Sequence, residues 1–257
     1  MPAGVARLAN GASIYEAEHA VVFEADGNVD YYLDEGTTLA AEAKAQFVGR
    51  FVSQRATLLD VGASFGHFLA ATSGRFDALG VELNPTAVEW SRREFGVRNF
   101  IGSVYSLPPD LPHSFDVITA WDVIEHLDEP RRALAACRAH LKPGGWLFLS
   151  TPDAGAIIAR AMGARWYYQD PVQHVNLFTR RNLARLLEES GFKVEGCTYF
   201  GRQYRVRYVV NRIAYLVNSH PVRHIVKLLQ KLPEAALQSS VTIKMWDVMG
   251  LVARVAG

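Results

Sequence analysis

The segment from Leu58 to His67, LLDVGASFGH, constrains the fold of this chain more than any other stretch. It begins as a short apolar run, which is typical of a buried parallel strand. It then turns on small residues and continues as FLAA, which predicts a helix. Such a junction places free backbone N–H groups and the positive end of the helix dipole beside a ligand. Gly62 and Gly66 lack a Cβ, so a ligand can approach the main chain closely.

A second predicted strand, from Ala78 to Glu82, ends in a carboxylate 22 residues after Asp60. An acid at the tip of a neighbouring strand can accept hydrogen bonds from both hydroxyls of a ribose. The two features together predict a nucleoside site, whereas the loop alone is equally consistent with a plain strand–helix turn. The loop lacks the G-x-G-x-x-G spacing of dinucleotide-binding proteins, which disfavours a nicotinamide cofactor.

Four motifs, in this order, resemble those of class I S-adenosylmethionine-dependent methyltransferases, in particular the bacterial small-molecule branch that includes the ubiquinone-biosynthesis O-methyltransferases. They are Asp60 to Gly66, FDVI from Phe115, WDVIEHL from Trp121 and LKPGG from Leu141. The resemblance extends to about residue 200. It implies an α/β, Rossmann-like fold, in which a mostly parallel seven-stranded sheet has helices on both faces. It also implies S-adenosylmethionine as cofactor and S-adenosylhomocysteine as product.

The resemblance carries cofactor-binding roles onto the matching positions. The backbone of the glycine loop is expected to hold the methionine part, Glu82 the ribose hydroxyls, and Leu83 the adenine. Trp121 and Asp122 are expected beside the sulfonium and the amino group. The full expected set is Asp60, Gly62, Ala63, Ser64, Gly66, His67, Glu82, Leu83, Ser103, Val104, Trp121 and Asp122.

Two positions depart from the family pattern. Ser64 stands where the middle glycine is usual, a small change because serine is small. Ser103, expected with Val104 at the adenine edge, replaces an acid that commonly accepts from the adenine amino group. A hydroxyl can still accept, but more weakly than a carboxylate, so adenine recognition is expected to be weaker here.

The chain is expected to form a single domain in four stretches. They are an N-terminal cap and helix at 1–56, a cofactor-binding core at 57–151, a substrate-facing connection at 152–178, and a completion of the sheet at 179–257. Core strands are predicted near 57–61, 77–82, 98–101, 115–120 and 145–150, and core helices near 66–73, 85–95 and 129–141. A helix from Thr179 to Ser190 and strands near 192–200 and 246–255 follow.

Two segments outside the core carry the remaining expectations for the fold. A leading helix from Thr37 to Ser53 is predicted to bury the face formed by Leu39, Ala43, Phe47 and Phe51. Tyr32 is a candidate for closing over the cofactor, with simple packing as the alternative. A helical insert at about 202–245, before the last strand, is expected to leave the sheet at the ligand edge, as is the 152–178 connection.

The insert is strongly basic, with seven Lys or Arg and no acid between residues 202 and 231. Arg223, Lys227 and Lys231 are four apart and form one helical stripe. One interpretation is a solvated face of two packed helices. The others are a site for an anionic acceptor, such as a phosphorylated or lipid-linked sugar, or a peripheral membrane contact.

An alcohol or phenol acceptor must lose a proton, and histidine is the usual base near neutral pH. His174, in the aromatic connection, is the candidate general base, with a hydrogen-bonding strut as the alternative. His126 is expected at the same edge, where it fixes its loop. Asp122 and Glu125 are spaced to share a helix face, but no third ligand stands out, so no metal is predicted.

Composition limits the remaining function classes. The formal net charge is +1, so nothing global indicates nucleic acid. The two cysteines lack zinc-type spacing and fit free thiols in a reducing cytoplasm. We expect a cytoplasmic methyltransferase for a small-molecule or glycan-type acceptor, with a hydroxyl oxygen as the methylated atom. The alternatives are an N- or C-methyltransferase of the same fold and a catalytically silent S-adenosylmethionine-binding partner protein.

Overall fold

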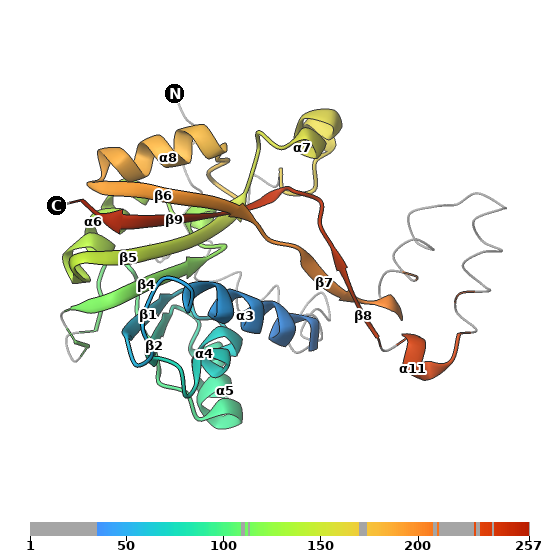
Figure 1. Ribbon diagram of the computed structural model, residues 1–257, viewed down its shortest axis with the longest axis horizontal. Coiled ribbons are helices and arrows are strands. Elements are labelled where there is room, and N and C mark those ends of the chain that lie inside the picture. Colours follow the sequence, from blue (N-terminus) through green and yellow to red (C-terminus); the bar gives the residue numbers. More distant parts are fainter. Residues whose placement is uncertain are drawn as a thin grey trace, which may run out of the picture.

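The computed structural model describes residues 35–108, 111–112, 114–169, 174–207, 210, 229, 232–237 and 239–256 (Figure 1). Its main sheet has seven strands in the order β3-β2-β1-β4-β5-β9-β6, and only β9 is antiparallel to its neighbours. The strands are β1 Thr57–Val61, β2 Asp77–Glu82, β3 Asn99–Ile101, β4 Phe115–Trp121, β5 Leu141–Pro152, β6 Phe192–Tyr199 and β9 Val248–Val255. This confirms the predicted Rossmann-like sheet.

Helices connect the strands and cover both faces of the sheet. The described helices are α3 Glu35–Val48, α4 His67–Thr72, α5 Pro85–Phe95, α6 Pro130–His140, α7 Ile157–Met162, α8 Arg180–Glu189 and α11 Glu234–Leu237, with 3₁₀ turns η1 Ile124–His126 and η2 Gly163–Arg165. Side chains alternate along the strands, so Leu59 and Ile118 pack on one face with α6 and α8. Leu58 and Val117 pack on the other with α3 and α4.

Local sequence signals set the helix ends that frame the core. The side chain of Asn84 accepts hydrogen bonds from the first turn of α5, Pro85 is the first helical residue, and Gly96 ends the helix in a left-handed conformation. Thr179 and Asn182 form a reciprocal capping box at the start of α8. The predicted positions of both helices are therefore confirmed.

The predicted buried face of the leading helix is confirmed at Phe47, which packs against Phe148, and is wrong at its other positions. Helix α3 ends at Val48, so Phe51 lies beyond it, and Leu39 and Ala43 are exposed. The buried residues are instead Ala41, Ala45 and Val48. Small residues at this spacing let α3 lie close to the sheet. With this face buried, the helix is rotated about its axis from the predicted orientation, and other side chains of α3 point toward the strand ends. Tyr32 lies outside the described residues.

The predicted helical insert is wrong at its two ends. Residues Arg202–Arg205 form β7 and Ser240–Ile243 form β8, which pair as an antiparallel two-stranded sheet. Figure 1 shows this arm extending beyond the strand ends of the main sheet, with α11 near its tip. Backbone pairing between the two returning chains satisfies their N–H and C=O groups without a helix. The basic stripe of the insert lies outside the described residues.

The carboxyl ends of the parallel strands meet at one edge of the sheet, which we call the rim. Because β6 runs parallel to β5, both the arm after Tyr199 and the connection after Pro152 leave from this edge. The prediction that these two segments leave at the ligand edge is confirmed. In the part of the chain that the structure describes, no helix is long and apolar enough to cross a bilayer.

Candidate active site

The carboxylate of Glu82 lies against the glycine loop at the rim. Its Oε2 accepts a hydrogen bond of 2.9 Å from the backbone N–H of Ser64, and its Oε1 accepts one of 2.9 Å from the N–H of Asn84. Because the tip of β2 and the loop after β1 are joined in this way, the acid points toward the surface between Gly62 and Gly66. The acid and the loop, which the sequence predicts to form one site, therefore touch each other in the structure.

The N–H groups of the loop residues that precede helix α4, from Gly62 to Ser64 and at Gly66, are already used inside the protein. Those of Gly62 and Ala63 both donate to the carbonyl oxygen of Val81, at 2.9 and 3.1 Å, and that of Gly66 donates to Ala63 at 2.9 Å. A buried loop must satisfy its own donors when no ligand does so. These groups therefore stiffen the loop. The carbonyl oxygens of Ala63, Ser64 and Gly66 also accept hydrogen bonds within the protein, so a ligand could use only the second lone pair of each.

The loop conformation requires small residues. Gly62 and Gly66 have positive φ angles of 71° and 75°, and Ser64 has 47°. A Cβ on Gly62 would lie 2.5 Å from Cγ2 of Val123, which excludes a larger residue even apart from the backbone conformation. Serine in place of the usual middle glycine is accommodated in the left-handed region at the cost of some strain.

Trp121 is the last residue of β4 and Asp122 follows it, at the rim next to the glycine loop. Asp122 has a left-handed φ of 56°, its N–H donates to the carbonyl of Ser150, and its Oδ1 accepts 2.9 Å from the Ser150 hydroxyl. The ring of Trp121 is held edge-on by Phe68 and by Phe200, at centroid distances of 5.4 and 5.7 Å. Both side chains are therefore fixed in orientation by their neighbours.

Two residues that sequence reasoning missed complete this part of the rim. Lys44, on α3, places its Nζ 3.4 Å from Oδ2 of Asp122 and 5.0 Å from the centroid of the Trp121 ring. Phe200, at the base of the arm, packs against both Trp121 and Phe47. Lys44 could have been recognised as a rim residue if the buried face of α3 had been assigned correctly. The predicted rotation of α3 did not direct Lys44 toward the rim.

Asp60 lies beneath the rim, where it is buried and accepts a hydrogen bond of 2.6 Å from the Thr119 hydroxyl. Burial raises the pKa of this carboxyl from 3.8 to about 7. The Thr119 hydrogen bond and the charge of Lys44 oppose this rise, while the charge of Glu82 adds to it. Asp60 thus ties β1 to β4 directly under the loop.

Asp60→Asn should flatten the pH dependence of stability. The folded pKa lies above the unfolded one, so the wild type loses unfolding free energy as the pH rises from about 4 to 7. Three pKa units correspond to about 4 kcal/mol, which the variant should no longer lose. Urea denaturation at pH 4 and pH 8 measures this loss. Asp77→Asn, at an exposed aspartate, should leave the pH dependence close to wild type; equal slopes for Asp60→Asn and wild type would refute the effect.

The remaining expected cofactor residues lie around the same edge with different exposures. Leu83 is 42% exposed, whereas Val104 is buried in the core. The Ser103 hydroxyl accepts 3.2 Å from the N–H of Tyr105, which closes a short turn. His67 begins α4, and its ring packs near Trp90 at a centroid distance of 5.8 Å. Its surroundings are therefore largely aromatic.

Two histidines and a glutamate come together beyond β4. The rings of His126 and His174 are 4.9 Å apart, and ligand-type atoms of Glu125, His126 and His174 all lie within 4.8 Å of one another. Nδ1 of His174 lies 2.7 Å from the carbonyl oxygen of Tyr168. A carbonyl only accepts, so Nδ1 carries the proton, and Nε2 of the neutral ring carries the lone pair.

The expectation that Asp122 and Glu125 share a helix face is wrong. Asp122 precedes the 3₁₀ turn in a left-handed conformation and is partly exposed, whereas Glu125 is buried. Burial, and then the charge of Asp122, raise the pKa of Glu125 above its ordinary value. Glu125, His126 and His174 are instead the described residues whose chemistry suits a divalent metal. The predicted absence of a metal remains a prediction.

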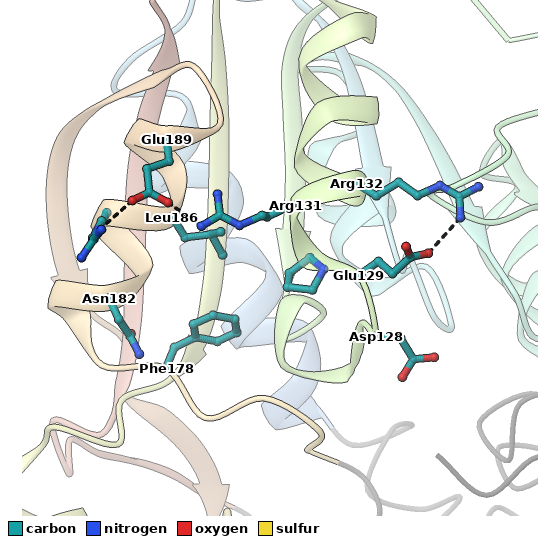
Figure 2. Close-up of a pocket in the computed structure, with 10 residues that line it drawn as sticks. Asp128, Glu129, Arg131, Arg132, Phe178, Asn182, Leu186 and Glu189 are labelled. Atoms are coloured by element: carbon teal, nitrogen blue, oxygen red, sulfur yellow. Dashed lines mark hydrogen bonds and ion pairs between the residues drawn. The ribbon is translucent and has the colours of Figure 1, made fainter. Parts of the chain in front are cut away.

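A surface groove of about 650 Å³ lies between the first turn of α6 and one side of α8, from Asn182 to Glu189 (Figure 2). Its charges pair with one another: Glu189 binds both Arg131 and Arg185, and Arg132 binds Glu129. None of the expected cofactor-binding residues lines it. The groove is therefore separate from the edge formed by Glu82 and the glycine loop.

Comparison with known proteins agrees with this geometry. A family model described as "Methyltransferase domain" matches residues 32–196. A ubiquinone biosynthesis O-methyltransferase from Xanthomonas euvesicatoria is 31% identical over 182 residues, covering 63% of this chain and 76% of the relative. One from Thiobacillus denitrificans is 29% identical over 170 residues, covering 58% of this chain and 73% of the relative.

Solved structures support the fold independently. A SAM-dependent methyltransferase from Archaeoglobus fulgidus superposes with a TM-score of 0.59 at 17% identity, over 92% of this chain and 99% of that one. The strand order and the glycine loop define the class I methyltransferase architecture. The chain belongs to the methyltransferase-domain family, and it is an S-adenosylmethionine-dependent methyltransferase.

Proposed function

We propose that this enzyme transfers the methyl group of S-adenosylmethionine to a hydroxyl oxygen of a small molecule. The observation that carries the proposal is the contact between Glu82 and the Ser64 N–H, which puts a ribose acceptor and the glycine loop at one edge. The relatives named as ubiquinone biosynthesis O-methyltransferases support oxygen as the acceptor atom. Methylation of nitrogen or carbon on the same fold is the alternative.

The donor fits the residues present at the rim. Two carboxylate oxygens on Glu82 suit two ribose hydroxyls, and the exposed Leu83 offers an apolar surface for adenine. Ser103 and the backbone of Val104 are proposed for the adenine edge. The loop is proposed to hold the methionine part by its shape and by the second lone pairs of its carbonyl oxygens, since four of its N–H groups have protein partners. Carbonyl oxygens suit the ammonium of that part.

The aromatic face of Trp121 and the carboxylate of Asp122 are proposed to lie beside the sulfonium and the amino group. Both groups attract a cation, the ring through its quadrupole and the carboxylate through its charge. The structure already pairs them with the cation of Lys44, at 5.0 and 3.4 Å. The ion pair between Lys44 and Asp122 supports the fit of a positively charged ligand at this position.

His174 is the proposed general base. When bound, the donor supplies an activated methyl group, so the protein has to align the acceptor and remove its proton. The contact with the Tyr168 carbonyl places the proton of a neutral His174 ring on Nδ1, so Nε2 is its basic atom. With the donor bound, Nε2 would take the hydroxyl proton as the oxygen–methyl bond forms and the sulfur–methyl bond breaks. His126 is proposed to hold the loop that carries it.

The acceptor and the cellular setting remain proposals that rest on the sequence. We propose a cytoplasmic enzyme whose acceptor is anionic or linked to a lipid or sugar, since seven cationic side chains lie between residues 202 and 231. A peripheral membrane contact through the same segment is the second candidate. Most of this segment lies outside the described residues, and so does its basic stripe.

Calorimetry and a matched pair of acceptors test the proposed function. The protein should bind S-adenosylmethionine and S-adenosylhomocysteine, and it should transfer labelled methyl to a catechol in preference to the corresponding aromatic amine. Transfer to the amine alone would move the acceptor atom to nitrogen. Failure to bind either ligand would overturn the assignment of the rim as the donor site.

A further inference from the structure

Helix α3 delivers a cation to the rim. The Lys44 side chain is 19% exposed, and its Nζ lies 3.4 Å from Oδ2 of Asp122 and 5.0 Å above the Trp121 ring. A carboxylate and an aromatic face together form an arrangement that recognises positive charge. We propose that Lys44 is a positioning residue that competes with the donor's sulfonium: its ammonium occupies the place between Trp121 and Asp122 until the sulfonium enters and displaces it.

The two partners of Lys44 are held so that they can exchange one cation for another. Oδ1 of Asp122 is engaged by the Ser150 hydroxyl, which leaves Oδ2 to face the cation. The Trp121 ring makes T-shaped contacts with Phe68 and Phe200, so its orientation is fixed. Only the flexible lysine chain has to move when a second cation arrives.

The carboxylate of Asp122 faces this position and favours a cation in it. Asp60 and Glu125 are buried nearby; burial raises the pKa of each, and the charge of Lys44 opposes that rise. Loss of a positive charge here would leave Asp122 without its ion-pair partner. The site is therefore expected to exchange Lys44 for another cation rather than for a neutral group.

Methyl transfer changes the charge of the ligand that competes with Lys44. The sulfonium carries a positive charge before transfer, and the product sulfur is a neutral thioether. Lys44 therefore opposes binding of S-adenosylmethionine but has no like charge to avoid in S-adenosylhomocysteine. The ammonium of the methionine part is common to both ligands and cancels in their affinity ratio. Lys44 therefore lowers the ratio of product Kd to donor Kd. After transfer, its ammonium returns to the Trp121 ring.

Lys44→Met tests this inference, which rests on the proposed donor site. Methionine keeps an unbranched chain and removes the charge. Calorimetric Kd values for both ligands should show the ratio of product Kd to donor Kd rising about tenfold, within the range of a single cation–π contact. Lys44→Arg should stay near the wild-type ratio. Lys142→Met, at a lysine paired with Asp116 away from the rim, is the matched control.

The outcomes separate the two proposals. If the wild type binds neither ligand, the donor site itself fails. If the wild type binds both and the ratio is unchanged in Lys44→Met, the role of Lys44 is refuted, because a purely structural lysine would shift both affinities equally. Lys44→Gln provides a second neutral variant should the methionine variant not fold, and the same ratio decides the result.

Discussion

Glu82→Gln should weaken binding of S-adenosylmethionine about 100-fold, because charge-assisted hydrogen bonds contribute roughly 1.5–3 kcal/mol each. The carboxylate now accepts from the N–H groups of Ser64 and Asn84. An amide offers one acceptor oxygen and turns an NH₂ donor toward the other N–H, so both the ribose contact and the loop contact suffer. Calorimetry with the donor measures the loss.

A matched exposed glutamate and a modified ligand make the Glu82 result specific. Glu89→Gln, on the exposed side of α5, should bind the donor like the wild type. A donor analogue without the ribose 2′-hydroxyl should bind the wild type more weakly, and should lose less affinity in Glu82→Gln. Wild-type affinity in Glu82→Gln would contradict the ribose role.

His174→Ala should lower kcat about 100- to 10,000-fold, the usual contribution of a positioned base. Binding of S-adenosylmethionine should change little, since His174 is not among the residues proposed to contact the donor. Turnover of a hydroxylated acceptor and calorimetry with the donor, made on the same preparation, separate the two effects. Unchanged turnover would remove His174 from the mechanism.

Two comparisons distinguish a base from a strut or a metal ligand. His174→Asn retains an N–H for the Tyr168 carbonyl, so restored activity would indicate a structural role. His140→Ala, at the far end of α6, is the matched control, because this half-buried ring also has its Nδ1 2.9 Å from a backbone carbonyl. Because Glu125 and His126 lie within ligand distance of His174, metal content and turnover should also be measured after chelation. Activity that survives chelation but not His174→Ala supports the base.

The core of the fold was predictable from the sequence because its signals are local. Asn84, Pro85 and Gly96 mark both ends of α5, and short apolar runs mark the buried strands. The contact between Glu82 and the loop followed from one strand–helix–strand unit, in which the chain itself fixes the distance. In these elements local preference and tertiary packing agree.

Lys44 and the arm could not be predicted in the same way. The rotation of α3 depends on how closely the sheet lets a helix approach, and the choice of Ala41 and Ala45 over Leu39 for burial is a property of packing. The strands β7 and β8 pair only with each other across the insert, so neither carries a buried face with a period of its own. His174, which lies beside Glu125 and His126, is likewise distant from them in the sequence.

The way the arm is attached has a consequence for how acceptor choice can evolve. Its two ends continue from β6 and β9, which are adjacent and paired along their whole length, so the distance between the attachment points is fixed by the sheet. Residues between Phe200 and Asp247 can lengthen, shorten or be exchanged without altering that spacing. Phe200 connects this segment to Trp121 by direct packing. A changed segment can therefore bring a new acceptor specificity while the methyl-transfer residues stay the same.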